Sequence, residues 1–100
     1  MKSFLKTIIL ILFTNFNLFA QTNADFSSNV TSGCSPLSVK FTNLSTGNPT
    51  SFYWNFGNGQ TSVKINPSAT YLNPGSYTVI LKVSDANGTN TITKTNFITV

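Results

Sequence analysis

The residues able to do chemistry in this 100-residue chain are few: one cysteine and two aspartates, with no His, Glu or Arg. The usual general base and the commonest metal ligand are therefore missing. A carboxylate pair would need Asp25 and Asp85 to meet, and one Cys without His cannot build a zinc site of the usual kind. Since an active site needs several such groups in contact, we predict that the protein is not an enzyme and holds no metal or cofactor.

Cys34 is the one thiol of the chain, so it has no partner for an internal disulfide. An odd thiol in an exported protein indicates either an intermolecular disulfide or a free thiol. A nucleophilic role would need a base to form the thiolate, and the chain has no His to provide one.

Residues 1–20 have the pattern of a secretory signal peptide: two early lysines, an apolar run over residues 8–13, and a small residue, Ala20, before a predicted cleavage at Gln21. The alternative is a retained membrane anchor. It is less favoured because Thr14 interrupts the run well short of the ~20 apolar residues that a membrane span needs. We therefore predict a secreted or cell-surface protein with no membrane attachment after cleavage.

Residues 21–100 form the predicted mature domain, in which four lysines against two aspartates give a net charge of +2. The lysines are scattered singly, whereas a nucleic-acid footprint needs basic residues clustered on one face. We expect no nucleic-acid partner. A domain of this size can fold alone, although it lies near the lower end of comfortable stability.

The mature part alternates apolar and polar residues in short runs at residues 37–42, 52–56 and 77–83, which predicts strands because side chains alternate across a strand. A first strand near residues 25–30 contributes Phe26. The pattern predicts an all-β sandwich of two antiparallel sheets. Its predicted structural core includes Phe41, Trp54, Phe56, Tyr77 and Val79, with Trp54 at the centre and Tyr77 placed as a tyrosine corner.

The last predicted strand, residues 89–100, loses its alternation at Phe97. Two explanations stay open: a bulge near residues 94–96, or packing of Phe97 on the outer face. The outer face of the longest strand is expected to carry Ile80, either as ordinary surface scatter or as a contact point for a neighbouring domain.

Turn residues separate the predicted strands. Gly57-Asn58-Gly59 predicts a tight hairpin, because Asn and Gly tolerate positive φ. Asn73-Pro74-Gly75 suits a type II turn with Gly75 in the left-handed position. Asp85-Ala86-Asn87-Gly88 predicts a hairpin between the two longest strands.

Three aromatic residues are candidates to face outward and contact a ligand: Tyr53, Tyr71 and Phe97. Exposed rings stack on sugar faces or meet a partner protein. The alternative, which we favour for Tyr71 and Phe97, is that these two rings cover the edges of the sandwich.

Three segments place Trp, Phe, Gly, Pro and Tyr at set distances: Trp54-Asn55-Phe56-Gly57-Asn58-Gly59, Asn66-Pro67 and Pro74-Gly75-Ser76-Tyr77-Thr78-Val79. With these segments the chain resembles the polycystic kidney disease (PKD) domain family, from about Ala24 to Val100. The resemblance implies an immunoglobulin-like β-sandwich. It also implies a non-catalytic extracellular module of the kind found beside bacterial proteases, chitinases and adhesins.

Many members of that family have Asp where Asn55 and Asn58 stand here, and some of those carboxylates help bind calcium. Asn55, Asn58 and Asp85 still offer oxygens, but neutral amides are weaker ligands, so calcium binding is not expected. Related sequences often pair a Cys at the place of Cys34 with one at the place of Thr89. The resemblance therefore favours Cys34 as a relic of a lost disulfide, partly buried at the start of a strand.

Together these features predict a module for adhesion, domain spacing or weak contact with a protein or glycan at the cell surface. The alternative is a dedicated carbohydrate-binding module that uses Tyr53, Tyr71 and Phe97. A coplanar set of these rings would favour the alternative, whereas burial or scatter of the rings would count against it.

Overall fold

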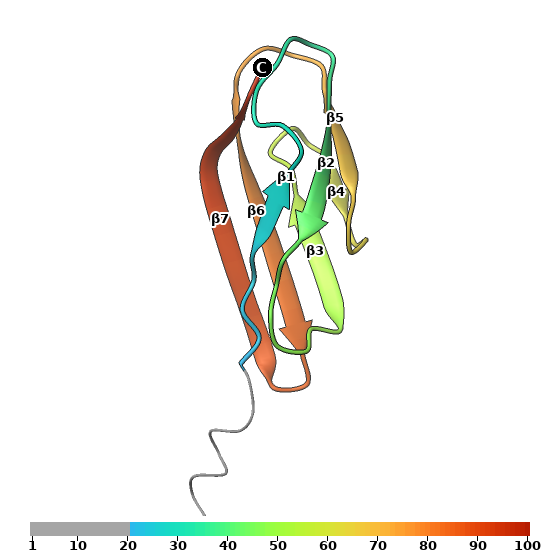
Figure 1. Cartoon of the computed structure of the whole chain (residues 1–100), viewed down its shortest axis with the longest axis vertical. Coiled ribbons are helices and arrows are strands. Elements are labelled where there is room, and N and C mark those ends of the chain that lie inside the picture. The colour runs from blue at the N-terminus through green and yellow to red at the C-terminus, as the bar shows by residue number, and fades with distance from the viewer. Residues whose placement is uncertain (1–20) are drawn as a thin grey trace, which may run out of the picture.

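The computed structural model describes residues 21–100, and the predicted signal peptide lies outside the described residues. Within this part of the chain, seven strands form two antiparallel sheets that pack face to face (Figure 1). One sheet has the order β1-β2-β5, from strands Phe26–Ser28, Leu37–Asn43 and Ser68–Tyr71. The other has the order β4-β3-β6-β7, from Thr61–Ser62, Ser51–Asn55, Ser76–Asp85 and Gly88–Thr99.

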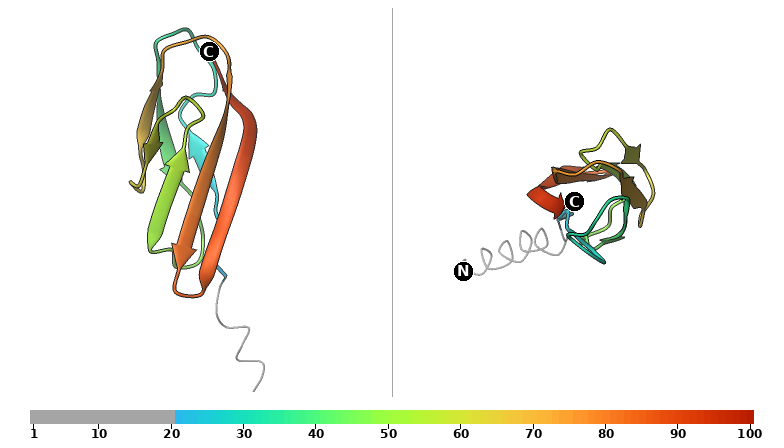
Figure 2. Two further views of the ribbon diagram at one scale, coloured as in Figure 1. Left: turned by 180° about the vertical axis from the view of Figure 1, so that it is seen from behind. Right: turned by 90° about the horizontal axis from the view of Figure 1, so that it is seen from above.

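These sheet orders correspond to strands A-B-E and C′-C-F-G of the immunoglobulin fold. The left view of Figure 2 shows the second sheet from behind, with β3, β6 and β7 side by side. The predicted immunoglobulin-like β-sandwich is therefore confirmed. No helix in residues 21–100 is long and apolar enough to cross a membrane.

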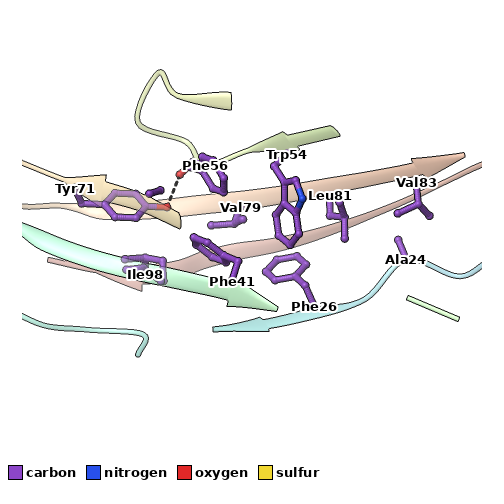
Figure 3. Close-up of a cluster of buried hydrophobic side chains, with 12 residues drawn as sticks. Ala24, Phe26, Phe41, Trp54, Phe56, Tyr71, Val79, Leu81, Val83 and Ile98 are labelled. Atoms are coloured by element: carbon purple, nitrogen blue, oxygen red, sulfur yellow. Dashed lines mark hydrogen bonds between the residues drawn. The ribbon is translucent and has the colours of Figure 1, made fainter. Parts of the chain in front are cut away.

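The core lies between the sheets and is built from the inward side chains of the alternating strands (Figure 3). Trp54 is completely buried at its centre, with the Phe26 ring edge-on at 5.2 Å between centroids. Its indole Nε1 donates a hydrogen bond of 2.8 Å to the Lys64 carbonyl, so the one polar atom of the ring is satisfied. The buried apolar residues are Ala24, Phe26, Val39, Phe41, Trp54, Phe56, Ala69, Tyr71, Val79, Leu81, Val83 and Ile98.

Tyr77 stands at the start of β6, as predicted for a tyrosine corner. Its hydroxyl donates to the Asn73 carbonyl, four residues upstream, at 2.6 Å. The side chain is half-buried and packs against the core, with its ring 4.7 Å from that of Tyr71. The hydroxyl thus fixes the loop that leads into β6, as the tyrosine corner does in related folds.

A bulge in β7 explains the lost alternation at Phe97. Tyr77 pairs with Ile98 but Val79 pairs with Lys94, so the β7 chain has extra residues opposite Thr78. Asn96 takes up the bulge with a φ of 51°, and its N–H donates to the Thr78 hydroxyl at 3.1 Å. The bulge turns Phe97 toward the core, where its ring meets Phe26 edge-on at 5.5 Å. The bulge is therefore confirmed, and packing of Phe97 on the outer face is wrong.

The Gly57-Asn58-Gly59 hairpin joins β3 to β4 as predicted, with a φ of 81° at Gly57. A Cβ on Gly57 would come within 2.4 Å of the Thr78 carbonyl, so only glycine fits there. The type II turn predicted at Asn73-Pro74-Gly75 is wrong in detail. Gly75 has a φ of 152° and exchanges backbone hydrogen bonds with Val100, so it extends the β6–β7 ladder instead of closing a turn.

Candidate functional site

The strongest candidate for a contact surface is the outer face of the four-stranded sheet, which we define as the outward side chains of β3, β6 and β7. The pairing register arranges these side chains in three rows across the strands. The rows are Ser51-Ser84-Thr89, Tyr53-Lys82-Thr91 and Asn55-Ile80-Thr93. The outer face therefore presents an aromatic ring and a cation at the centre of a field of hydroxyl groups.

Tyr53 is the aromatic ring of the outer face, with 44% of its surface exposed. Its direct partner across the ladder is Lys82, which is also exposed. The two side-chain carboxylates in residues 21–100 are engaged elsewhere: Asp25 pairs with Lys94 at 3.4 Å, and Asp85 accepts from Thr22. The ammonium of Lys82 therefore has no ion-pair partner within this part of the chain.

Tyr53 is the only one of the three candidate ligand-contact aromatics that faces outward. Tyr71 is completely buried, because it lies on the inward side of β5 directly opposite Leu37. The expectation that Tyr71 faces outward or covers an edge is therefore wrong. Phe97 is half-buried against the core, so it stays a covering residue as we favoured. The structure brings no coplanar set of these rings together.

The threonines of β7 form the part of the outer face that sequence analysis missed. Thr89, Thr91 and Thr93 are all exposed, at alternate positions of the strand. The Thr-x-Thr-x-Thr spacing was the available signal, since alternate residues share one face of a strand. The hydroxyls of Thr89 and Ser84 also lie 3.2 Å apart across the ladder.

Asp85 is the last residue of β6, and its carboxylate is held by hydrogen bonds within the β6–β7 hairpin and from Thr22. One carboxylate oxygen accepts the N–H groups of Asn87 and Gly88 at 2.8 and 3.1 Å, and the other accepts the Thr22 hydroxyl. These hydrogen bonds, of which that from the Thr22 hydroxyl has the largest effect, hold the pKa of Asp85 below its usual 3.8. Asp85 therefore acts as an ionised clamp on the hairpin and the N-terminal segment.

The oxygens considered for calcium are not brought together. Asn55 lies at one end of β3, whereas Asp85 follows Ser84 at the other end. The Asn55 side-chain oxygen accepts the Gly57 N–H at 2.9 Å, and the Asn58 oxygen accepts the Gln60 N–H at 3.0 Å. Both amides thus shape the hairpin, and Asn58 also donates to the Thr70 carbonyl at 3.0 Å.

Cys34 is exposed in the loop between β1 and β2, so its predicted partial burial is wrong. The loop leaves its thiol at the surface because the inward positions begin later, in β2. A second surface feature is a polar hollow of about 560 Å³ lined by residues between the end of β3 and the start of β5, among them Gln60, Lys64 and Ser68.

The family model and two of the solved structures point to the same family. A family model described as a PKD domain matches residues 20–100. Among curated proteins, the pre-pro-metalloprotease PrtV of Vibrio cholerae is 45% identical over 56 residues, which are 56% of this chain. The matched segment spans only 6% of the length of that relative.

Solved structures extend the likeness over most of the chain. The PKD1 domain of Vibrio anguillarum Epp superposes with a TM-score of 0.68 at 37% identity, covering 82% of this chain and 98% of that one. The PKD1 domain of Vibrio cholerae PrtV gives 0.68 at 35% identity, covering 81% and 100%. A structure concerning carbohydrate-binding modules of the β-sandwich superfamily gives 0.70 at 25% identity, covering 80% and 35%.

Proposed function

The chain belongs to the PKD domain family, and on that premise we propose that residues 21–100 act as a non-catalytic extracellular module that contacts a protein or glycan. The observation that carries the proposal is the difference in coverage. The chain covers 98% and 100% of two isolated PKD1 domains but 6% of a full metalloprotease. The shared unit is therefore one complete sandwich that accompanies much longer chains in its relatives.

The proposed location is outside the cell, either secreted or at the cell surface. It rests on the signal-peptide pattern of residues 1–20, with a short apolar run and a small residue before Gln21. Intact mass of the exported protein tests it. A mass that corresponds to residues 21–100 supports export with cleavage, whereas retention of residues 1–20 contradicts cleavage and supports the membrane-anchored alternative.

The outer face of the four-stranded sheet is the proposed contact surface. A tyrosine supplies a large amphipathic contact at a low cost in side-chain entropy, because it has only two rotatable side-chain bonds. Tyr53 lies beside a lysine with no ion-pair partner in residues 21–100 and beside exposed hydroxyls. Such a surface suits weak, polar contacts and offers no set of groups for bond making or breaking.

Carbohydrate binding is the second candidate for the same surface. The likeness to a structure of carbohydrate-binding modules and the exposed ring of Tyr53 favour it. The burial of Tyr71 and the inward packing of Phe97 count against a dedicated aromatic platform. Carbohydrate would then be held by one stacked ring, with hydroxyl groups around it.

A glycan array and a pull-down from cell-surface extracts, both with residues 21–100, test the proposal and separate its two forms. Isolated PKD1 domains of the same extent supply the precedent for using this part alone. Retention of a surface protein supports the protein-contact form, and a glycan signal supports the carbohydrate form. Binding of neither kind, or turnover of an added substrate by the domain, would contradict the proposal.

A further inference from the structure

The edge of the four-stranded sheet at β7 carries an inference beyond the proposed function. β7 is an edge strand of 12 residues, whereas the edges at β1, β4 and β5 are 3, 2 and 4 residues long. An edge strand presents unpaired backbone N–H and C=O groups that can pair with another strand. Among the described strands, β7 is therefore the one long enough to template a partner.

The direction of the β7 backbone groups follows from the ladder. In an antiparallel ladder, the N–H and C=O of one residue point to the same side, and the side alternates from residue to residue. The Ser84 carbonyl accepts the Thr50 N–H, so Ser84 faces β3 and does not bond to its β7 partner, Thr89. The backbone groups of Thr89 consequently point away from β6, and those of Thr91 and Thr93 do so by alternation.

Another part of this chain already pairs with the β7 edge near the C-terminal end of the strand. The Thr99 N–H donates to the Thr31 carbonyl at 2.8 Å, and the Thr99 carbonyl accepts the Gly33 N–H at 3.2 Å. The loop between β1 and β2 thus covers the edge at Thr99. Within residues 21–100, no hydrogen bond of this kind covers the edge at Thr89, Thr91 or Thr93.

The side chains along this uncovered stretch carry no charge. Residues 89–93 read Thr-Asn-Thr-Ile-Thr, and the neighbouring Lys94 is turned inward. Its ammonium donates to the Phe26 carbonyl at 2.6 Å and lies 4.7 Å from the centre of the Phe26 ring. Lys94 therefore adds no repulsion at the open stretch, and the bulge at Asn96 ends the stretch just beyond it.

We propose that β7 of a second copy of this chain pairs antiparallel with residues 89–93, about a two-fold axis at Thr91. In this register Thr91 faces Thr91, and Thr89 faces Thr93. Opposed threonines are favourable cross-strand pairs, so the stretch is complementary to itself. The pairing is isologous and closes at two copies, and it joins two four-stranded sheets into one continuous sheet.

We infer a second copy as the partner because residues 89–93 carry no charge that would select a different protein. The paired stretch is only five residues long, so the dimer is weak and depends on protein concentration. The outer face continues across the joined sheet and brings two copies of Tyr53 onto one surface. Paired copies would gain avidity for a repetitive ligand without any new contact to it.

Sedimentation velocity over a range of concentrations, with residues 21–100 carrying Cys34→Ser, tests the pairing. We expect a monomer that shifts to a dimer as concentration rises. The Cys34→Ser background removes the exposed thiol, so a dimer that persists in it supports strand pairing. A monomer at every concentration would overturn the proposal, as would a dimer that exists only with Cys34 present.

Two variants at the axis sharpen the test. Thr91→Pro removes an N–H that the β6–β7 ladder does not use, so we expect a folded monomer with an unchanged near-ultraviolet spectrum of Trp54. Thr91→Lys places like charges opposite each other across the axis and should weaken the dimer roughly tenfold. Ser38→Lys is the matched control, because it adds the same charge on an exposed position of β2.

The outcomes of these variants are distinct. Weakening of the dimer by Thr91→Lys but not by Ser38→Lys supports the β7 interface, even if Thr91→Pro fails to fold. A dimer that Thr91→Lys leaves unchanged would overturn it. A short bismaleimide should also cross-link Thr91→Cys, and it should not cross-link Val63→Cys on the remote β4–β5 loop.

Discussion

The Tyr71 hydroxyl donates a hydrogen bond of 2.9 Å to the Phe56 carbonyl, and this bond joins the two sheets inside the core (Figure 3). Tyr71 ends β5 in the three-stranded sheet, whereas Phe56 follows β3 in the four-stranded sheet. We expect Tyr71→Phe to reduce the free energy of unfolding by about 1–3 kcal/mol, because a buried carbonyl loses its donor. Urea unfolding, followed by Trp54 fluorescence, measures the loss; an unchanged midpoint would contradict the bond's role.

Alkaline pH should act through the same residue. Burial, assisted by the nearby Tyr77, raises the pKa of Tyr71 from 10.0 to about 12. Because the folded pKa lies above the unfolded one, the stabilisation is complete below pH 10 and is lost as pH rises toward 12. The free energy of unfolding of the native protein should fall across this window. Tyr71→Phe should fall less steeply there, and an equal slope in both proteins would refute the assignment.

Truncation of the central indole should be the most damaging single change. Trp54 is completely buried among Phe26, Phe41 and Phe56. We expect Trp54→Ala to cost roughly 3–5 kcal/mol, through the lost apolar burial and the cavity that remains. Tyr53→Ala is the matched control, since the neighbouring ring faces solvent and its removal should cost about 1 kcal/mol or less. Circular-dichroism melting compares the two, and similar shifts for both would contradict the core assignment.

In the β3–β4 hairpin, replacing Gly57 should cost more stability than replacing Asn58. Gly57→Ala should cost about 2 kcal/mol or more, because Gly57 has positive φ and its Cβ would clash with the Thr78 carbonyl. Asn58→Ala should cost only about 1 kcal/mol, since it loses partly exposed hydrogen bonds to Thr70 and Gln60. Thermal melting of both variants checks the order, and a larger cost for Asn58→Ala would reverse it.

Acid should loosen the clamp made by Asp85. Its folded pKa is lowered, so its stabilising contribution is present above the usual 3.8 and disappears as pH falls below that value. We expect Asp85→Asn to lose less stability than the native protein as pH falls through this window. Its loss of stability at alkaline pH should be the same as that of the native protein. Melting temperatures from pH 5 to about pH 2 measure this effect. If the native protein and Asp85→Asn lose the same stability over this pH range, the hydrogen bonds of Asp85 contribute nothing to stability.

Local alternation was enough to predict most strands, but not the residues whose role depends on distant partners. The inward faces at Val39, Trp54 and Leu81 follow directly from the two-residue period. β5 was not predicted as a strand because its four residues include only one large apolar side chain, Tyr71, beside Ala69. Tyr71 therefore looked like a surface ring, since no local signal reports that it faces Leu37.

The same limit applies to the candidate site. Tyr53 was predicted to face outward from its alternation with Trp54, and it does. Its neighbours Lys82 and Thr91 come from β6 and β7, so their places in one row depend on the pairing register. The pairing register is fixed by turns, bulges and the buried face acting together, and their combined effect cannot be predicted from a single sequence.

Binding of the Tyr53→Ala variant tests the central claim most directly. The native domain, Tyr53→Ala and the control Ile65→Ala are compared by surface plasmon resonance against the protein or glycan retained in the first screen. Ile65 is a suitable control because it is exposed on the β4–β5 loop, away from the outer face. We predict that Tyr53→Ala weakens binding at least roughly tenfold, whereas Ile65→Ala leaves it unchanged. Equal binding by the native domain and Tyr53→Ala, with both folded, would contradict the outer face as the contact surface.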